Sequence, residues 1–116
     1  MKEAVFSRSV TKYLESVGAI VNNQTGSMFS KVGVSDLLIC YKGIFIALEL
    51  KVGNYQPDPL QIVYLQKVRE SGGIGLLLRD TLEDLETVIY MIDNNVLMQY
   101  NQPELPKIEL EEIEYD

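Results

Sequence analysis

Three side chains on two neighbouring predicted strands could perform chemistry together. Asp36 opens the apolar run at 36–42, and Glu49 and Lys51 end the next apolar run at 44–51. Side chains along a strand alternate between the two faces of a sheet, so Glu49 and Lys51 share a face. Two carboxylates inside an apolar sheet repel each other and lose hydration, so a cation should lie between them. Lys51 supplies part of that positive charge.

A hard divalent cation would supply the rest. Mg²⁺ is usually held by one or two carboxylates together with waters and substrate phosphates. Water bound to such an ion has a lowered pKa, which provides a nucleophile in a chain of 116 residues without histidine. Lys51 could orient that water or stabilise the negative charge that develops on phosphorus oxygens. These residue types favour metal-assisted hydrolysis of a phosphodiester.

The turn between the two strands decides whether the carboxylates meet. A two-residue loop at 42–43 places Asp36 directly opposite Glu49, with Cβ atoms ~5 Å apart. A three-residue loop that ends in a bulge at Gly43 puts Asp36 out of phase. Lys42 is poorly suited to the positive φ of a type I′ turn, and both strands are apolar on both faces, so alternation does not choose between the registers. We favour the two-residue loop because it brings Asp36, Glu49 and Lys51 together on one face, where they could act as one site.

The alternative for Glu49 and Lys51 is an ordinary ion pair at the end of a strand. With 11 Glu and 7 Lys in the chain, chance alone yields roughly 0.7 Glu-x-Lys triplets. The context favours a functional role, because the triplet ends a buried strand that follows a hairpin opened by Asp36.

Composition narrows the remaining possibilities. The absence of histidine and the single Cys40 exclude Ser-His and Cys-His catalysis, cysteine-rich zinc sites and an internal disulfide. No apolar run approaches the ~20 residues that span a bilayer, and the N-terminus does not resemble a signal peptide. We therefore expect a cytoplasmic protein without a membrane partner.

The net charge of −7 argues against a nucleic-acid partner until its distribution is considered. Residues 1–80 hold nine Lys or Arg and seven Asp or Glu, whereas residues 81–116 hold one and ten. The acidity therefore belongs to the C-terminal third, and the body of the chain is faintly basic.

The elements that must position these residues follow the order αβββαβα. Hydrophobic periodicity and turn signals predict helices at 2–17, 59–71 and 81–93 and strands at 19–23, 36–42, 44–51 and 74–79. We expect one domain over 1–100, followed by an acidic tail at 101–116 that is solvated and partly disordered. Alternation within the tail leaves an added edge strand or a dimer arm as the alternative.

Several segments together resemble the VRR-NUC family, the virus-type replication-repair nuclease branch of the PD-(D/E)XK superfamily. The segments are GVSDLL at 33–38, IALELK at 46–51, PLQ at 59–61 and the Gly72–Gly73 pair. The resemblance runs from about residue 3 to residue 79, and the proline of the family's PD motif is Ser35 here.

This resemblance implies an α/β fold with a restriction-endonuclease-like αβββαβ core, a mixed central sheet flanked by helices. It also implies Mg²⁺- or Mn²⁺-dependent endonucleolytic cleavage of DNA, often at branched sites such as Holliday junctions. Small stand-alone members resemble phage proteins that act in DNA repair as homodimers, which would place this one in the host cytoplasm.

Carried over position by position, the resemblance makes Asp36, Glu49 and the backbone carbonyl of Leu50 metal ligands. It makes Lys51 the catalytic lysine. Glu3 matches the N-terminal helix glutamate of the family and is a further candidate ligand. The alternative for Glu3 is a first-turn acid that favours the helix dipole.

Gln61 matches the family's helix glutamine and is a candidate catalytic residue. Its alternative is a capping box with Asp58, which would explain the glutamine without catalysis.

DNA contact is expected from Lys31, in the loop before the motif, and from Arg8 on the first helix. Such phosphate contacts give affinity without sequence preference, and no base-reading motif accompanies them. The competing interpretation is a catalytically silent domain of the same fold that binds DNA or a protein, which the acidic tail favours. Retention of the Asp, Glu and Lys together favours the enzyme.

Overall fold

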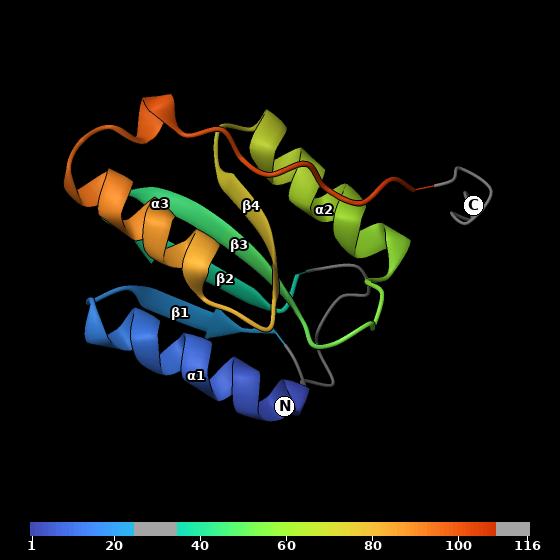
Figure 1. The fold of residues 1–116 in the computed structure, drawn as a ribbon. Coiled ribbons are helices and arrows are strands. Elements are labelled where there is room, and N and C mark those ends of the chain that lie inside the picture. The colour runs from blue at the N-terminus through green and yellow to red at the C-terminus, as the bar shows by residue number, and fades with distance from the viewer. Residues whose placement is uncertain (25–34, 109–116) are drawn as a thin grey trace.

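The chain folds around a mixed four-stranded sheet (Figure 1). The computed structural model describes residues 1–24 and 35–108. Its elements are α1 (Glu3–Ser16), β1 (Ile20–Asn23), β2 (Leu37–Tyr41), β3 (Ile44–Lys51), α2 (Pro59–Glu70), β4 (Ile74–Arg79), α3 (Glu83–Asp93) and a 3₁₀ turn at Leu97–Gln99. The predicted order αβββαβα is confirmed.

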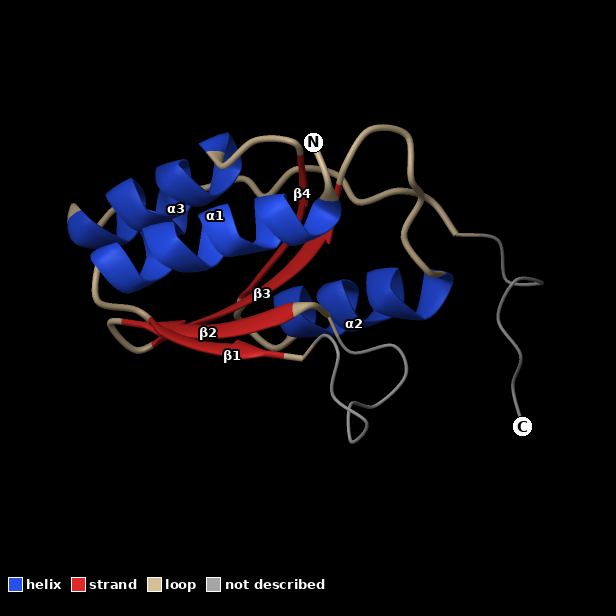
Figure 2. Cartoon of the chain, turned by 90° about the horizontal axis from the view of Figure 1, so that it is seen from below, coloured by secondary structure: helices blue, strands red, loops and turns tan. Residues whose placement is uncertain are grey.

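The sheet is covered by helices on both faces. Its strand order is β1-β2-β3-β4, with antiparallel pairing up to β3 and a parallel β3–β4 pair. Figure 2 shows α1 and α3 together on one face and α2 on the other. The larger core lies under α1 and α3, where Phe6, Val10 and Leu14 of α1 are buried. Among the described residues, no helix has the length and apolar character that a membrane crossing requires.

The β2–β3 hairpin has the two-residue register that places Asp36 on the face of Glu49. Tyr41 pairs with Ile44, and the pairing continues in phase to Leu37. Lys42 occupies the turn with φ 47°, although lysine is unfavourable there.

The end of α3 holds this turn. Lys42 Nζ lies 2.7 Å from Asp93 Oδ1, and the Tyr41 hydroxyl donates a 2.6 Å hydrogen bond to the same oxygen. These two contacts lower the pKa of Asp93 and anchor the strained turn to α3.

Helix α2 lies unusually close to β4. A Cβ atom on Gly75 would lie 2.6 Å from the Leu65 carbonyl oxygen, so only glycine fits there. Leu65 and Val68 of α2 pack on Ala47 of β3 in a second, smaller core. This smaller core covers the face of the sheet on which Glu49 lies.

Residues 101–108 differ from the expected solvated tail. Gln102 Oε1 accepts the Gly75 N–H at 2.9 Å, and its Nε2 donates to the Gly73 carbonyl at 3.1 Å. The side chain thus satisfies backbone groups of β4, which is an outer strand of the described sheet. Leu105 packs against the smaller core. The sequence did not predict these contacts, because the prolines and acidic residues of this segment are also typical of a solvated tail.

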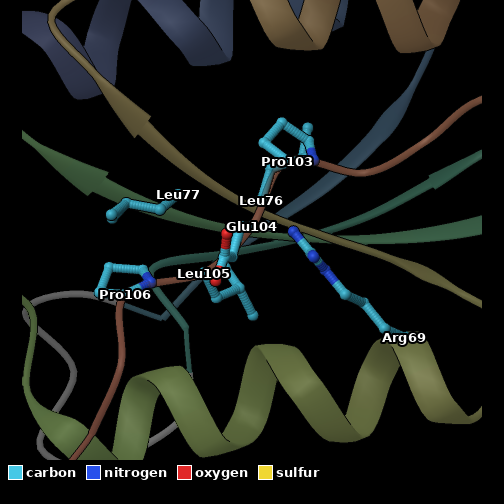
Figure 3. A pocket seen from close by; sticks show the side chains of 7 residues that line it. All are labelled: Arg69, Leu76, Leu77, Pro103, Glu104, Leu105 and Pro106. Atoms are coloured by element: carbon cyan, nitrogen blue, oxygen red, sulfur yellow. The ribbon is translucent and has the colours of Figure 1, made fainter.

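A hollow of about 310 Å³ remains between this segment, α2 and β4 (Figure 3). Arg69 reaches into it from α2, and its Nε donates to the Gly75 carbonyl at 2.9 Å. Burial lowers the pKa of Arg69. The remaining lining is mostly apolar, and the hollow contains none of the residues that the sequence marks for chemistry.

Replacement of Gln102 tests whether this segment belongs to the folded unit. Gln102→Ala should lower the free energy of unfolding by about 1–3 kcal/mol, because it leaves backbone groups of Gly73 and Gly75 without partners. Urea denaturation followed by circular dichroism measures the change. Gln99→Ala, at an exposed position in the 3₁₀ turn, is the matched control. Equal stability of the two variants would contradict a structural role for Gln102.

Candidate active site

Asp36 lies at the start of β2 with its carboxylate turned toward β3. Its Oδ2 accepts the backbone N–H of Leu50 at 2.9 Å. Antiparallel pairing of Leu37 with Leu48 brings Asp36 and Glu49 opposite each other on the α2 face of the sheet. The Leu50 bond fixes the Asp36 carboxylate in this position, although regular pairing begins only at Leu37.

Glu49 is fully buried, with 0% of its surface exposed, and neither carboxylate oxygen has a hydrogen-bond partner. Burial is the main cause that raises its pKa, to about 9, and the negative charge of Asp36 adds to the effect. Lys51 opposes the shift with an Nζ–Oε1 distance of 3.5 Å. Without another cation, Glu49 is therefore protonated at neutral pH.

Lys51 lies between carboxylates of two different elements. Its Nζ is 3.5 Å from Glu49 Oε1 and 3.6 Å from Glu3 Oε1 on α1. The Lys51 side chain is 17% exposed, whereas that of Glu3 is 52% exposed. The ammonium group thus stands at the boundary between the buried carboxylate and solvent.

A cleft of about 430 Å³ opens at this boundary, between the first turns of α1 and the end of β3. Its lining residues are Glu3, Ala4, Ser7, Arg8, Asn23, Asp36, Leu50 and Lys51. Glu49 is not among the lining residues. A ligand in the cleft would contact Asp36 and Lys51 directly.

The donor set suits a hard divalent cation with two protein carboxylates. Both oxygens of Glu49 are without hydrogen-bond partners, and Mg²⁺ accepts one or two carboxylates with waters completing its shell. The Leu50 N–H points to Asp36 on the β2 side, whereas the Lys51 carbonyl accepts the Asp80 N–H on the β4 side. Because the N–H and C=O of one strand residue face the same edge, the Leu50 carbonyl also faces Asp36.

A third carboxylate is not in place. Within residues 1–24 and 35–108, no group of three or more acidic or cysteine side chains is arranged to hold a metal ion. Glu3, the further candidate ligand, instead contacts Lys51.

Two other predicted residues take different positions. Gln61 completes a capping box, because its Oε1 accepts the Asp58 N–H at 3.0 Å while Asp58 caps α2. The structure therefore has the capping box that the sequence offered as the alternative. Gln61 does not line the cleft, and its catalytic role stays a prediction. Arg8 does line the cleft. Lys31 lies outside the described residues.

Sequence reasoning missed Asn23 as a neighbour of the site. Asn23 ends β1, pairs with Leu37 and lines the cleft beside Asp36. The polar pair Asn22–Asn23 at the end of a predicted strand was the available signal. The sequence does not show that β1 pairs with β2, and only this pairing places Asn23 next to Asp36.

The described fold resembles solved nuclease structures, although no family model and no curated protein matches the sequence. A VRR-NUC domain superimposes with a TM-score of 0.59 and 22% identity, over 76% of this chain and 94% of that one. Hjc, a Holliday junction resolvase from Archaeoglobus fulgidus, superimposes with a TM-score of 0.50 and 16% identity, over 66% of each chain. The chain therefore shares the fold of these two structures, and the predicted restriction-endonuclease-like α/β architecture is confirmed.

The pKa of Glu49 predicts how stability depends on pH when no metal is bound. Between pH 4.5 and about 9 the folded chain retains a proton that the unfolded chain has released. The free energy of unfolding should therefore fall as pH rises through this window, by up to about 1.4 kcal/mol per pH unit. Denaturation in EDTA at several pH values measures the slope.

Glu49→Gln should flatten this slope, because glutamine does not titrate. Glu70→Gln, at an exposed carboxylate of α2, should leave it unchanged. An unaltered slope in Glu49→Gln would show that Glu49 titrates normally.

Proposed function

We propose that this protein, whose fold is that of PD-(D/E)XK nucleases, is a divalent-metal-dependent DNA endonuclease. The observation that carries the proposal is the pair of opposed carboxylates, Asp36 and buried Glu49, with Lys51 beside them at the end of β3. The two solved structures support it, because they are a VRR-NUC domain and a Holliday junction resolvase with the same fold.

The cation would be Mg²⁺ or Mn²⁺, held by Asp36, Glu49 and the Leu50 carbonyl. When bound, such an ion supplies Lewis-acid stabilisation of a phosphoryl oxygen. The chain's own groups do the rest. Asp36 keeps its orientation through the Leu50 N–H, and the buried Glu49 contributes negative charge that only a cation or a proton can balance.

Lys51 is the group best placed to act on the substrate. Its ammonium lines the cleft, where it can stabilise negative charge that develops on the scissile phosphate. It also lies within reach of Glu3, so DNA must compete with that carboxylate for Lys51. Arg8, on the same cleft, would contact a flanking phosphate without reading sequence.

A second candidate is a catalytically silent module that binds DNA or a protein. The contact of Glu3 with Lys51 and the lack of a third ligand among the described residues favour it. The intact set of Asp36, Glu49 and Lys51 favours the enzyme, because a silent module has no use for a buried carboxylate whose oxygens lack hydrogen-bond partners.

Nicking of supercoiled DNA in Mg²⁺, Mn²⁺ or EDTA tests the proposal. The wild-type chain should nick DNA only with metal, and Asp36→Asn, Glu49→Gln and Lys51→Ala should each reduce the rate by about 100-fold or more. Glu70→Gln should retain the full rate. Lack of metal-dependent nicking would overturn the enzyme, and undiminished nicking by Glu49→Gln would place the active site elsewhere.

The proposed substrate is branched DNA, cut by a homodimer. A four-way junction and a flap should be cut faster than a linear duplex of the same composition, because shape and not base sequence is recognised. Light scattering should give twice the chain mass of 13.2 kDa, since paired cuts across a junction need two active sites. A monomer that cuts linear and branched DNA equally would contradict both parts.

A further inference from the structure

The loop between β3 and α2 holds an exposed aromatic side chain beside the proposed active site. Tyr55 is 73% exposed, although it lies only four positions after Lys51. Large apolar side chains exposed one at a time are common on protein surfaces. Tyr55 differs because its backbone is firmly held.

Two residues at the end of β4 hold this loop. Arg79 Nη1 donates to the carbonyls of Gly53 and Tyr55, both at 2.7 Å. The Gly53 N–H is shared between the two carboxylate oxygens of Asp80, at 3.0 and 3.1 Å. Within the loop, the Tyr55 N–H donates to the Val52 carbonyl at 3.3 Å. The backbone is thus ordered on both sides of an exposed ring.

The same contacts place Tyr55 next to the site. Arg79 pairs with Lys51 across the parallel β3–β4 ladder, and alternation puts both side chains on the face of Glu49. Arg79 then reaches the Tyr55 carbonyl. Tyr55 therefore lies at the end of the sheet where Asp36 and Lys51 line the cleft.

We propose that Tyr55 stacks on an unpaired nucleobase of the DNA, and so favours substrates with unpaired nucleotides beside the cut. This inference rests on the proposed function for its ligand. Base–aromatic stacking is tolerant of sequence, and it needs a base that is not already stacked within a duplex. An ordered loop loses little conformational entropy when the ring engages. Tyr55 would thus distinguish branched from fully paired DNA, which the phosphate contacts of Arg8 and Lys51 do not.

Binding measured in EDTA separates this inference from catalysis, because no DNA is cut. Fluorescence anisotropy compares a duplex that contains an unpaired loop with a fully paired duplex. Tyr55→Ala should weaken binding to the looped DNA about tenfold and leave binding to the paired duplex unchanged. Tyr55→Phe should bind like wild type, because stacking needs the ring and not the hydroxyl.

Tyr90→Ala is the matched control. Tyr90 is 66% exposed on α3, about one turn before Asp93, which contacts the hairpin turn at the opposite end of β2 and β3. It should bind both DNAs like wild type. A 2-aminopurine base in the unpaired loop should lose fluorescence on binding to wild type and retain it with Tyr55→Ala.

The outcomes are distinguishable from those of the nuclease assay. If wild type nicks DNA but Tyr55→Ala binds both DNAs normally, stacking is wrong and the enzyme stands. If Tyr55→Ala loses affinity for looped DNA while wild type never nicks DNA, stacking stands and the module is silent. Equal loss on both DNAs, or no binding of either DNA by wild type, overturns stacking.

Discussion

The opposition of Asp36 and Glu49 across the β2–β3 hairpin is the constraint on which the rest of the site depends. Burial raises the pKa of Glu49, and the negative charge of Asp36 on the same face of the sheet raises it further. Every polar contact nearby reduces this cost in part. The Leu50 N–H binds Asp36, and Lys51 approaches Glu49 at 3.5 Å. The remaining negative charge is what a proton or the proposed cation would balance.

The surrounding fold holds this unfavourable pair in place from several directions. Asp93 on α3 anchors the turn at Lys42, and the hairpin that this turn closes has the register that brings the two carboxylates together. Glycine at position 75 allows α2 to lie against the sheet and exclude water from the face of Glu49. Helix α1 brings Glu3 to Lys51.

The arrangement also explains how an acidic chain could act on DNA. Arg8 and Lys51 line the cleft and Arg79 lies next to Lys51, whereas residues 81–116 carry all of the excess negative charge. The segment at 101–108 packs beside α2 and β4, and none of it lines the cleft. Charge distribution, and not net charge, therefore decides which surface a polyanion can approach.

The sequence by itself determined the element order and identified Asp36, Glu49 and Lys51 as candidate site residues, because periodicity and residue type are local properties. It did not decide between two hairpin registers, since both strands are apolar on both faces; the contact of Lys42 with Asp93, 51 positions away, accompanies the register found. It left two explanations for Gln61, a catalytic role and a capping box, and the structure contains the capping box. It missed Asn23 and the anchoring of Gln102, because strand pairing and packing across the sheet join residues that no local pattern connects. Only the tertiary structure could show that Glu49 is fully buried, and that its charge must be balanced by a proton or by a cation.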